Sequence, residues 1–264
     1  MVKSRATAIV ELVSRETLRG SGFVRTKPRS WYEDNGWFLS NINFQAPVGW
    51  QGSFLNVGAT FLWTPGDDEM PPANSYDYAP GGNPRITVEG LPDRGRSVEY
   101  DGDDETFEDY FEIMARRGLE EGVKLRVLRD WLPAKDAVLR YRSVSEELWG
   151  NWDKAMMCFV TGDSRVTKYL NGFASFQFER NEWVQRFIAE QSAIFLPLVN
   201  DFPAAQLRIK NTIEENRQYV HDHWMPTLDT EWRFIAPPLG SIPEFPIDEP
   251  RNKRRLLERL SKRR

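Results

Sequence analysis

An Asn-Gly pair at positions 35 and 36 lies between two segments rich in aromatic residues. Asn-Gly adopts the two positive-φ positions of a type I′ turn more readily than almost any other pair, so it predicts a β-hairpin. The second strand continues to Gln45, and a third strand is expected over residues 54–63 after a loop that contains Pro and Gly. These segments predict a small antiparallel β-meander, with Ser30 opposite Asn41 and Tyr32 opposite Leu39.

Apolar residues at helical spacing predict an N-terminal helix over residues 6–19, followed by Gly20 at the C-cap position. From about residue 104 the chain is predominantly helical, with breaks at glycine and proline residues that include Gly118 and Pro133. Short helices with close breaks indicate antiparallel helical hairpins. The helices are expected at 104–117, 119–131, 134–149, 151–161, 164–171, 178–196 and 203–223. The fold class is therefore predicted to be α+β.

Residues 64–95 contain six prolines and five glycines, which predicts a long irregular loop with at most a short strand near residues 85–88. Residues 236–250 contain five prolines and are expected to form an extended strap. The chain is accordingly divided into an α+β sheet domain over 1–100, a helical region over 101–235, and a strap with a basic tail over 236–264.

The composition, with 40% hydrophobic and 28% charged residues, is that of a soluble globular protein. No apolar run is long enough to span a membrane, and the N-terminal residues lack the apolar region of a secretory signal. Cys158 is the sole cysteine, so an intramolecular disulfide and a zinc site built from several cysteines are excluded. Together these features predict a cytoplasmic protein.

The net charge of −4 is unevenly distributed along the chain. Residues 251–264 carry a net charge of +7, which leaves −11 on the rest of the protein. The tail is therefore a candidate binding element for nucleic acid, an acidic membrane or an acidic partner, or alternatively a helix that packs on the acidic body. The candidate binding residues within it are Arg254, Arg255, Arg259 and Lys262.

Four short segments of the predicted sheet region carry a family resemblance. They are the sequences Gly-Phe-Val-Arg from residue 22, Trp-Tyr from residue 31, Ile-Asn-Phe-Gln from residue 42 and Leu-Asn-Val-Gly from residue 55. Over residues 6–63 the chain resembles the domain of unknown function 4304 family. The resemblance implies an α+β domain without an established biochemical activity, and it carries over no catalytic residue.

Three amide side chains alternate with apolar residues along the second strand. Alternation places Asn41, Asn43 and Gln45 on one face of the sheet, and Trp37 is expected to extend this face. Amides beside aromatic rings could form a neutral groove that binds a peptide or a small ligand. The alternative is that the amides hold neighbouring loops or face solvent.

Other polar clusters favour structural roles. The acidic residues over 101–105 suit the first turn of a helix and lack the spacing of an EF-hand. His221 and His223 are the only histidines. Because they are two residues apart, a helix would point their side chains in nearly opposite directions. We therefore expect no metal site, no cofactor and no marked catalytic residue.

These observations predict a cytoplasmic, non-enzymatic binding or adaptor protein that recognises another protein, with nucleic acid as a further partner through the tail only. One alternative is an enzyme with a carboxylate-based site in residues 64–105, since acid–base catalysis needs only two well-placed carboxylates. Another is an immunity-type protein associated with a mobile element or a defence system.

Overall fold

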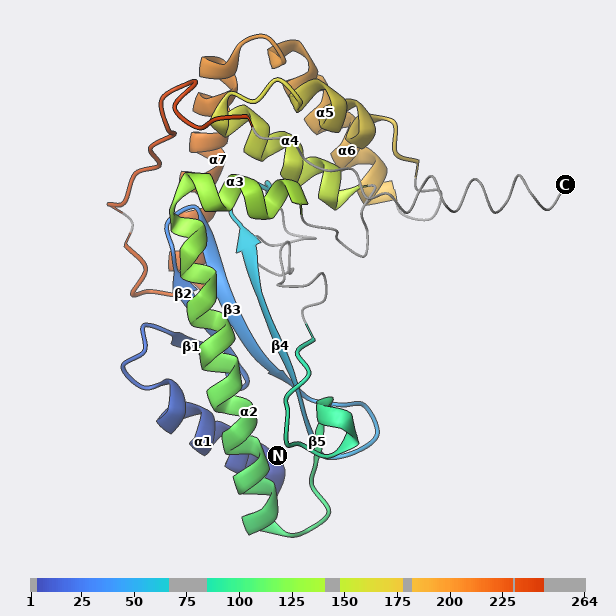
Figure 1. Cartoon of the computed structure of the whole chain (residues 1–264), viewed down its shortest axis with the longest axis vertical. Helices are drawn as coiled ribbons and strands as arrows, with labels where there is room; N and C mark the ends of the chain where they lie inside the picture. Colours follow the sequence, from blue (N-terminus) through green and yellow to red (C-terminus); the bar gives the residue numbers. More distant parts are fainter. Residues whose placement is uncertain (1–3, 67–84, 141–147, 178–181, 230, 245–264) are drawn as a thin grey trace, which may run out of the picture.

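The computed structural model describes residues 4–66, 85–140, 148–177, 182–229 and 231–244. It has an α+β fold in which a five-stranded antiparallel sheet is followed by a mostly helical region (Figure 1). The first part comprises α1 (Arg5–Leu18), β1 (Val24–Lys27), β2 (Ser30–Asp34), β3 (Phe38–Gln45), β4 (Gly52–Phe61), β5 (Val98–Glu99) and α2 (Asp104–Lys124). The second comprises α3 (Trp131–Arg140), α4 (Trp149–Thr161), α5 (Val166–Ala174), α6 (Glu182–Phe195) and α7 (Phe202–His223).

The strands follow one another in sequence order, β1-β2-β3-β4-β5, which confirms the predicted meander. The predicted hairpin register was wrong by two residues: Ser30 pairs with Asn43, and Tyr32 pairs with Asn41. The reason is that Asn35 still belongs to the ladder, where its N–H donates to Phe38 O at 3.0 Å, so the turn is made by Gly36 and Trp37. A shift of two residues keeps the side chains within the strands on their predicted faces, whereas Trp37 becomes a turn residue.

One face of the sheet is covered by α1 and α2, which pack against each other, and α2 runs along the direction of the strands (Figure 1). The predicted helix break at Gly118 was wrong, because α2 continues to Lys124. A Cβ at Gly118 would lie 3.0 Å from Leu55 Cδ1, and a Cβ at Gly122 would lie 2.7 Å from Phe23 Cζ. These glycines are therefore needed for close packing of the helix on the sheet, which overrides their low helix propensity.

Several other predicted boundaries differ from the structure. Pro133 lies in the first turn of α3, where a proline costs no hydrogen bond, rather than at a helix break. The helix predicted over 134–149 corresponds to α3 (Trp131–Arg140) and to the first residue of α4, which begins at Trp149, while residues 141–147 lie outside the described part. Arg85 forms only an isolated bridge with Asn56, whereas the short strand β5 was not predicted.

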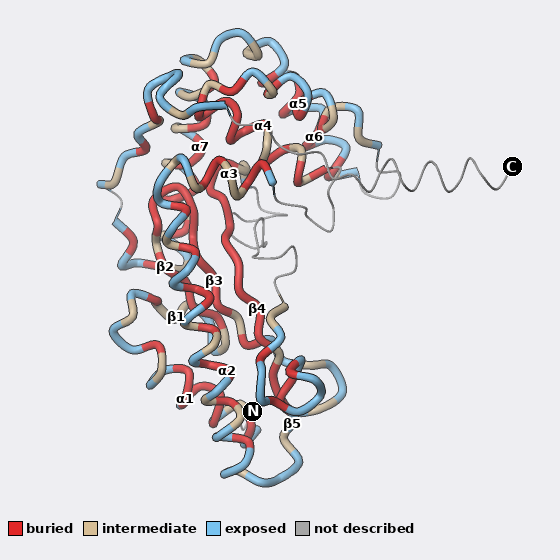
Figure 2. The backbone as a smooth tube through the Cα atoms, viewed as in Figure 1, coloured by how far each residue is buried: buried red, intermediate tan, exposed pale blue. Residues whose placement is uncertain are grey.

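Buried polar and aromatic contacts join the sheet to the helical region. The ring of Trp37 stacks on Trp63 and Trp131, with centroid distances of 4.9 and 5.2 Å. Trp63 Nε1 donates to Asp153 Oδ1 of α4 at 2.9 Å, and Asn216 of α7 donates to the carbonyls of Leu62 and Thr64, just after β4. In Figure 2 the central strands are buried along most of their length, and the outer surface of α2 is exposed.

Candidate functional site

The three predicted amides lie on one sheet face, where they bond to other parts of the fold. Asn43 Nδ2 donates to Ser30 Oγ at 2.8 Å. Gln45 Oε1 accepts from Asn56 Nδ2 at 3.0 Å and from Arg85 Nη2 at 2.7 Å. Asn43 therefore links β3 to β2, and Gln45 links β3 to β4 and to Arg85. These contacts match the alternative in which the amides hold neighbouring segments.

Asn41 lies deeper in this face than the other two amides. It is 4% exposed and sits opposite Tyr32, which is 7% exposed. Burial raises the pKa of Tyr32, and a hydrogen bond from Asn41 partly opposes that effect. Among the residues that the structure describes, the Oδ1 atom of Asn41 has no hydrogen-bond partner. This end of the amide face is closed to solvent, whereas Gln45 at the other end is exposed.

Trp37 is separated from the amides. It is 3% exposed and stacks within the aromatic cluster that joins the sheet to α3. The structure therefore does not bring Trp37 and the amides together as one aromatic–amide groove. The four basic residues predicted to bind a partner, Arg254, Arg255, Arg259 and Lys262, lie outside the described residues.

The acidic cluster before α2 caps that helix. Asp103 accepts from the backbone N–H groups of Glu105 and Thr106, and the Thr106 hydroxyl donates to it at 2.7 Å; these bonds lower the pKa of Asp103. Asp104 receives hydrogen bonds from the Tyr100 hydroxyl at 2.7 Å and from Arg5 Nε at 2.6 Å, and its pKa is lowered as well. These carboxylates are thus held in the charged form by structural contacts.

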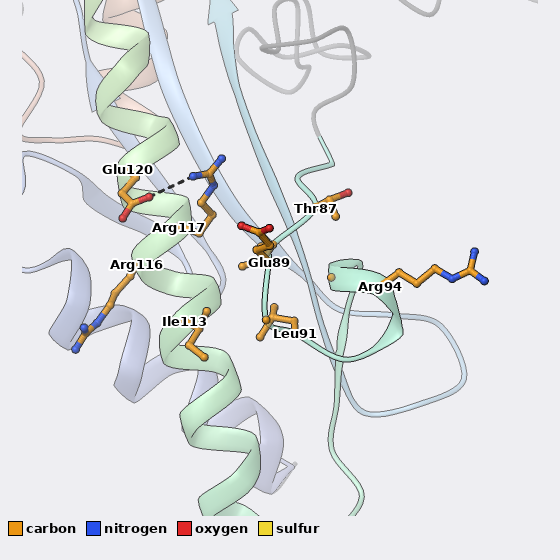
Figure 3. A pocket seen from close by; sticks show the side chains of 11 residues that line it. Thr87, Glu89, Leu91, Arg94, Ile113, Arg116, Arg117 and Glu120 are labelled. Carbon is orange, nitrogen blue, oxygen red and sulfur yellow. Dashed lines mark hydrogen bonds and ion pairs between the residues drawn. The ribbon is translucent and has the colours of Figure 1, made fainter.

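A cleft with a volume of about 610 Å³ lies between α2 and residues 87–95 (Figure 3). Leu91 and Ile113 provide apolar lining, and Ile113 is 42% exposed although it belongs to a helix that covers the sheet. Glu89 and Arg117 lie on facing walls, whereas the side chains of Arg94 and Arg116 extend away from the cleft (Figure 3). No motif in the sequence predicted this site, because its two walls come from separate segments of the chain.

The wall opposite α2 is held in place by backbone hydrogen bonds. Ile86 N–H donates to Leu55 O of β4 at 2.9 Å, and Val88 N–H donates to Gly95 O at 2.8 Å. The turn between them contains Asp93 and Arg94, which both have positive φ angles, of 47° and 54°. Such angles are uncommon outside glycine, so the surrounding contacts must fix this turn. The cleft is therefore preformed.

The charged groups around the cleft are largely paired along α2. Arg117 Nη2 lies 2.6 Å from Glu121 Oε1, and its Nη1 donates to Glu120 Oε2 at 3.4 Å. Arg116 pairs with Glu112 at 2.5 Å. The cleft thus combines apolar lining with a rim that carries both positive and negative charges.

The described residues contain no group of three His, Cys, Asp or Glu side chains arranged to hold a metal ion. His221 and His223 occupy the last turn of α7, where their Nδ1 atoms lie 2.8 Å from Asp222 Oδ1 and Tyr219 O, respectively. Within the same described ranges, no helix combines the length and the apolar character needed to cross a membrane.

Comparison with known proteins found no matching family model, no similar curated protein and no similar solved structure. The resemblance of residues 6–63 to the domain of unknown function 4304 family stays a prediction.

Proposed function

We propose that this chain is a cytoplasmic, non-enzymatic binding protein that holds an extended segment of a partner protein in the cleft between α2 and residues 87–95. The observation that carries the proposal is a preformed cleft of about 610 Å³ whose floor contains the exposed side chain of Ile113. A partner residue inserted beside Leu91 and Ile113 would remove their apolar surface from water. The rim groups Glu89, Arg117 and Glu120 would meet polar groups of the partner chain.

Acid–base catalysis by the carboxylates at the start of α2 is less well supported. A site for acid–base catalysis requires a carboxylate whose pKa is matched to proton transfer, usually one that is raised. The pKa values of Asp103 and Asp104 are instead lowered, because both groups accept several hydrogen bonds at the start of α2. Asp103 and Asp104 therefore support helix capping rather than proton transfer, while residues 67–84 of the alternative catalytic region lie outside the described residues.

The test is affinity capture from a nuclease-treated host lysate, with the full chain as bait and quantitative mass spectrometry as the readout. The Ile113→Lys variant places a charge on the cleft floor and should lower recovery of the partner by at least tenfold. The matched control is Val48→Lys, which makes the same kind of change at an apolar side chain that is 97% exposed. This control should capture the partner as well as the wild type does.

Equal recovery by wild type and the Ile113→Lys variant would refute the cleft as the binding site. Recovery of nucleic acid alone, lost at high salt when nuclease is omitted, would point to the basic tail instead. Melting temperatures of the three proteins should agree, which separates lost binding from lost folding.

A further inference from the structure

Residues 239–244 lie across the junction of α3, α4 and α5, and they contact it through three groups. Leu239 packs against Gly162, where an added Cβ would be 3.0 Å from Leu239 Cδ2. Pro243 O accepts a hydrogen bond from Lys135 Nζ at 3.1 Å. Glu244 Oε1 accepts from Ser164 N–H at 2.8 Å. From here on, the strap means residues 239–244 alone, which are part of the proline-rich segment predicted over 236–250.

The surface beneath the strap is built around buried charges. The side chains of Lys135 and Asp163 are both 0% exposed, and Lys135 Nζ lies 2.8 Å from Asp163 Oδ2. Arg165 Nη2 also lies 2.5 Å from Asp163 Oδ2. The three groups carry one negative and two positive charges, so the surface has a net positive charge that favours a carbonyl and a carboxylate above it. Pro243 O and the Glu244 carboxylate supply those two groups.

The strap itself is only weakly enclosed. Five of its six residues are exposed and Ile242 is partly buried, so lifting the strap exposes little apolar surface. Asp163 would keep its contacts with Lys135 and Arg165, because neither contact involves the strap. Segments with few buried apolar contacts open at a small fraction of the free energy of global unfolding.

We propose that the junction of Gly162, Ser164 and Lys135 is a binding site for an extended peptide, and that the strap is its resident, displaceable ligand. The external ligand that fits is a segment of another protein with an apolar residue five positions before an acidic one. Its apolar residue takes the place of Leu239, a backbone carbonyl meets Lys135, and its carboxylate meets the Ser164 N–H. This site is separate from the cleft at α2 and does not depend on the function proposed for that cleft.

Amide hydrogen exchange measured by NMR on the full chain tests this proposal. The Ser164 N–H donates to Glu244, so Glu244→Ala should accelerate its exchange by about tenfold or more, as expected for the loss of a charge-assisted hydrogen bond. The Arg165 N–H donates to Asp163 Oδ1 at 3.0 Å and should be unchanged. Glu231→Ala, at an exposed glutamate, is the matched control and should behave as the wild type.

A second measurement adds a synthetic peptide of the sequence Leu-Gly-Ser-Ile-Pro-Glu to the Glu244→Ala protein. The peptide should slow exchange at Ser164 again and shift its amide resonance, whereas the same peptide ending in alanine should do neither. Unchanged Ser164 exchange in the variant would overturn the proposal, as would equal acceleration at Arg165. Equal effects of the two peptides, or no effect of either, would also overturn it.

Discussion

The buried carboxylate of Asp163 offers the sharpest test of how the helical region is held together. Its side chain is fully buried and receives hydrogen bonds from Arg165 together with an ion pair from Lys135. Removing one partner of a buried ion pair costs about 3–5 kcal/mol, because the remaining charge loses its compensation. Asp163→Asn should therefore lower the free energy of unfolding by about 3–5 kcal/mol, which corresponds to a drop in melting temperature of roughly 6–20 °C.

Helix α3, which carries the Lys135 partner of Asp163, provides a control for this substitution. Asp136 and Arg140 of α3 form an ion pair at 2.5 Å in which the side chains are 45% and 56% exposed. Water screens such a pair, so Asp136→Asn should change stability by about 0.5 kcal/mol or less. Thermal and urea denaturation of both variants give the comparison. If Asp163→Asn destabilises the protein no more than Asp136→Asn does, the assignment of the buried charges as a stabilising cluster is refuted.

The pH dependence of stability should follow from the same carboxylate. Burial opposes ionisation of Asp163, but hydrogen bonds from Arg165 and Lys135 outweigh this effect and hold its pKa below the usual range. A carboxylate with a depressed pKa in the folded state stabilises the protein above its unfolded pKa of about 3.9, and this contribution is lost as the pH falls towards the folded value. The wild type should therefore lose more stability than Asp163→Asn between about pH 4 and pH 2.

Three further predictions concern other parts of the core. Trp37→Ala should cost about 3–5 kcal/mol in urea denaturation, because the buried ring stacks on Phe61, Trp63 and Trp131; a neutral result would contradict its structural role. Gly122→Val should destabilise the protein by at least about 1–3 kcal/mol, since its Cβ would lie 2.7 Å from Phe23 and 2.9 Å from Ile42, and an unchanged melting temperature would show that α2 can move away from the sheet. The Cys158 thiol, whose pKa is raised by burial, should resist a thiol reagent until urea unfolds the chain; rapid labelling of the native protein would contradict that burial.

Local patterns in the sequence were sufficient for the fold class and for most elements. Alternating residues and an Asn-Gly pair are properties of adjacent residues, so they predicted the meander and the faces of β3. The capping role of the acidic residues before α2 also follows from local chemistry, and Asp103 fulfils it. The same local view misplaced the hairpin turn by one residue, because cross-strand pairing decides which residues close the ladder.

Tertiary packing decided the features that carry the functional proposals. Gly118 and Gly122 are helix breakers by propensity, yet they remain in α2 because only glycine lets the helix approach the sheet so closely. The cleft forms where α2 meets a segment about 25 residues earlier in the chain, and the strap meets Lys135 across more than 100 residues. The sequence by itself determined the α+β class, the sheet faces and the helix cap, because each depends on neighbouring residues. Only the tertiary structure decided the cleft and the buried charge cluster, because both depend on contacts between distant segments.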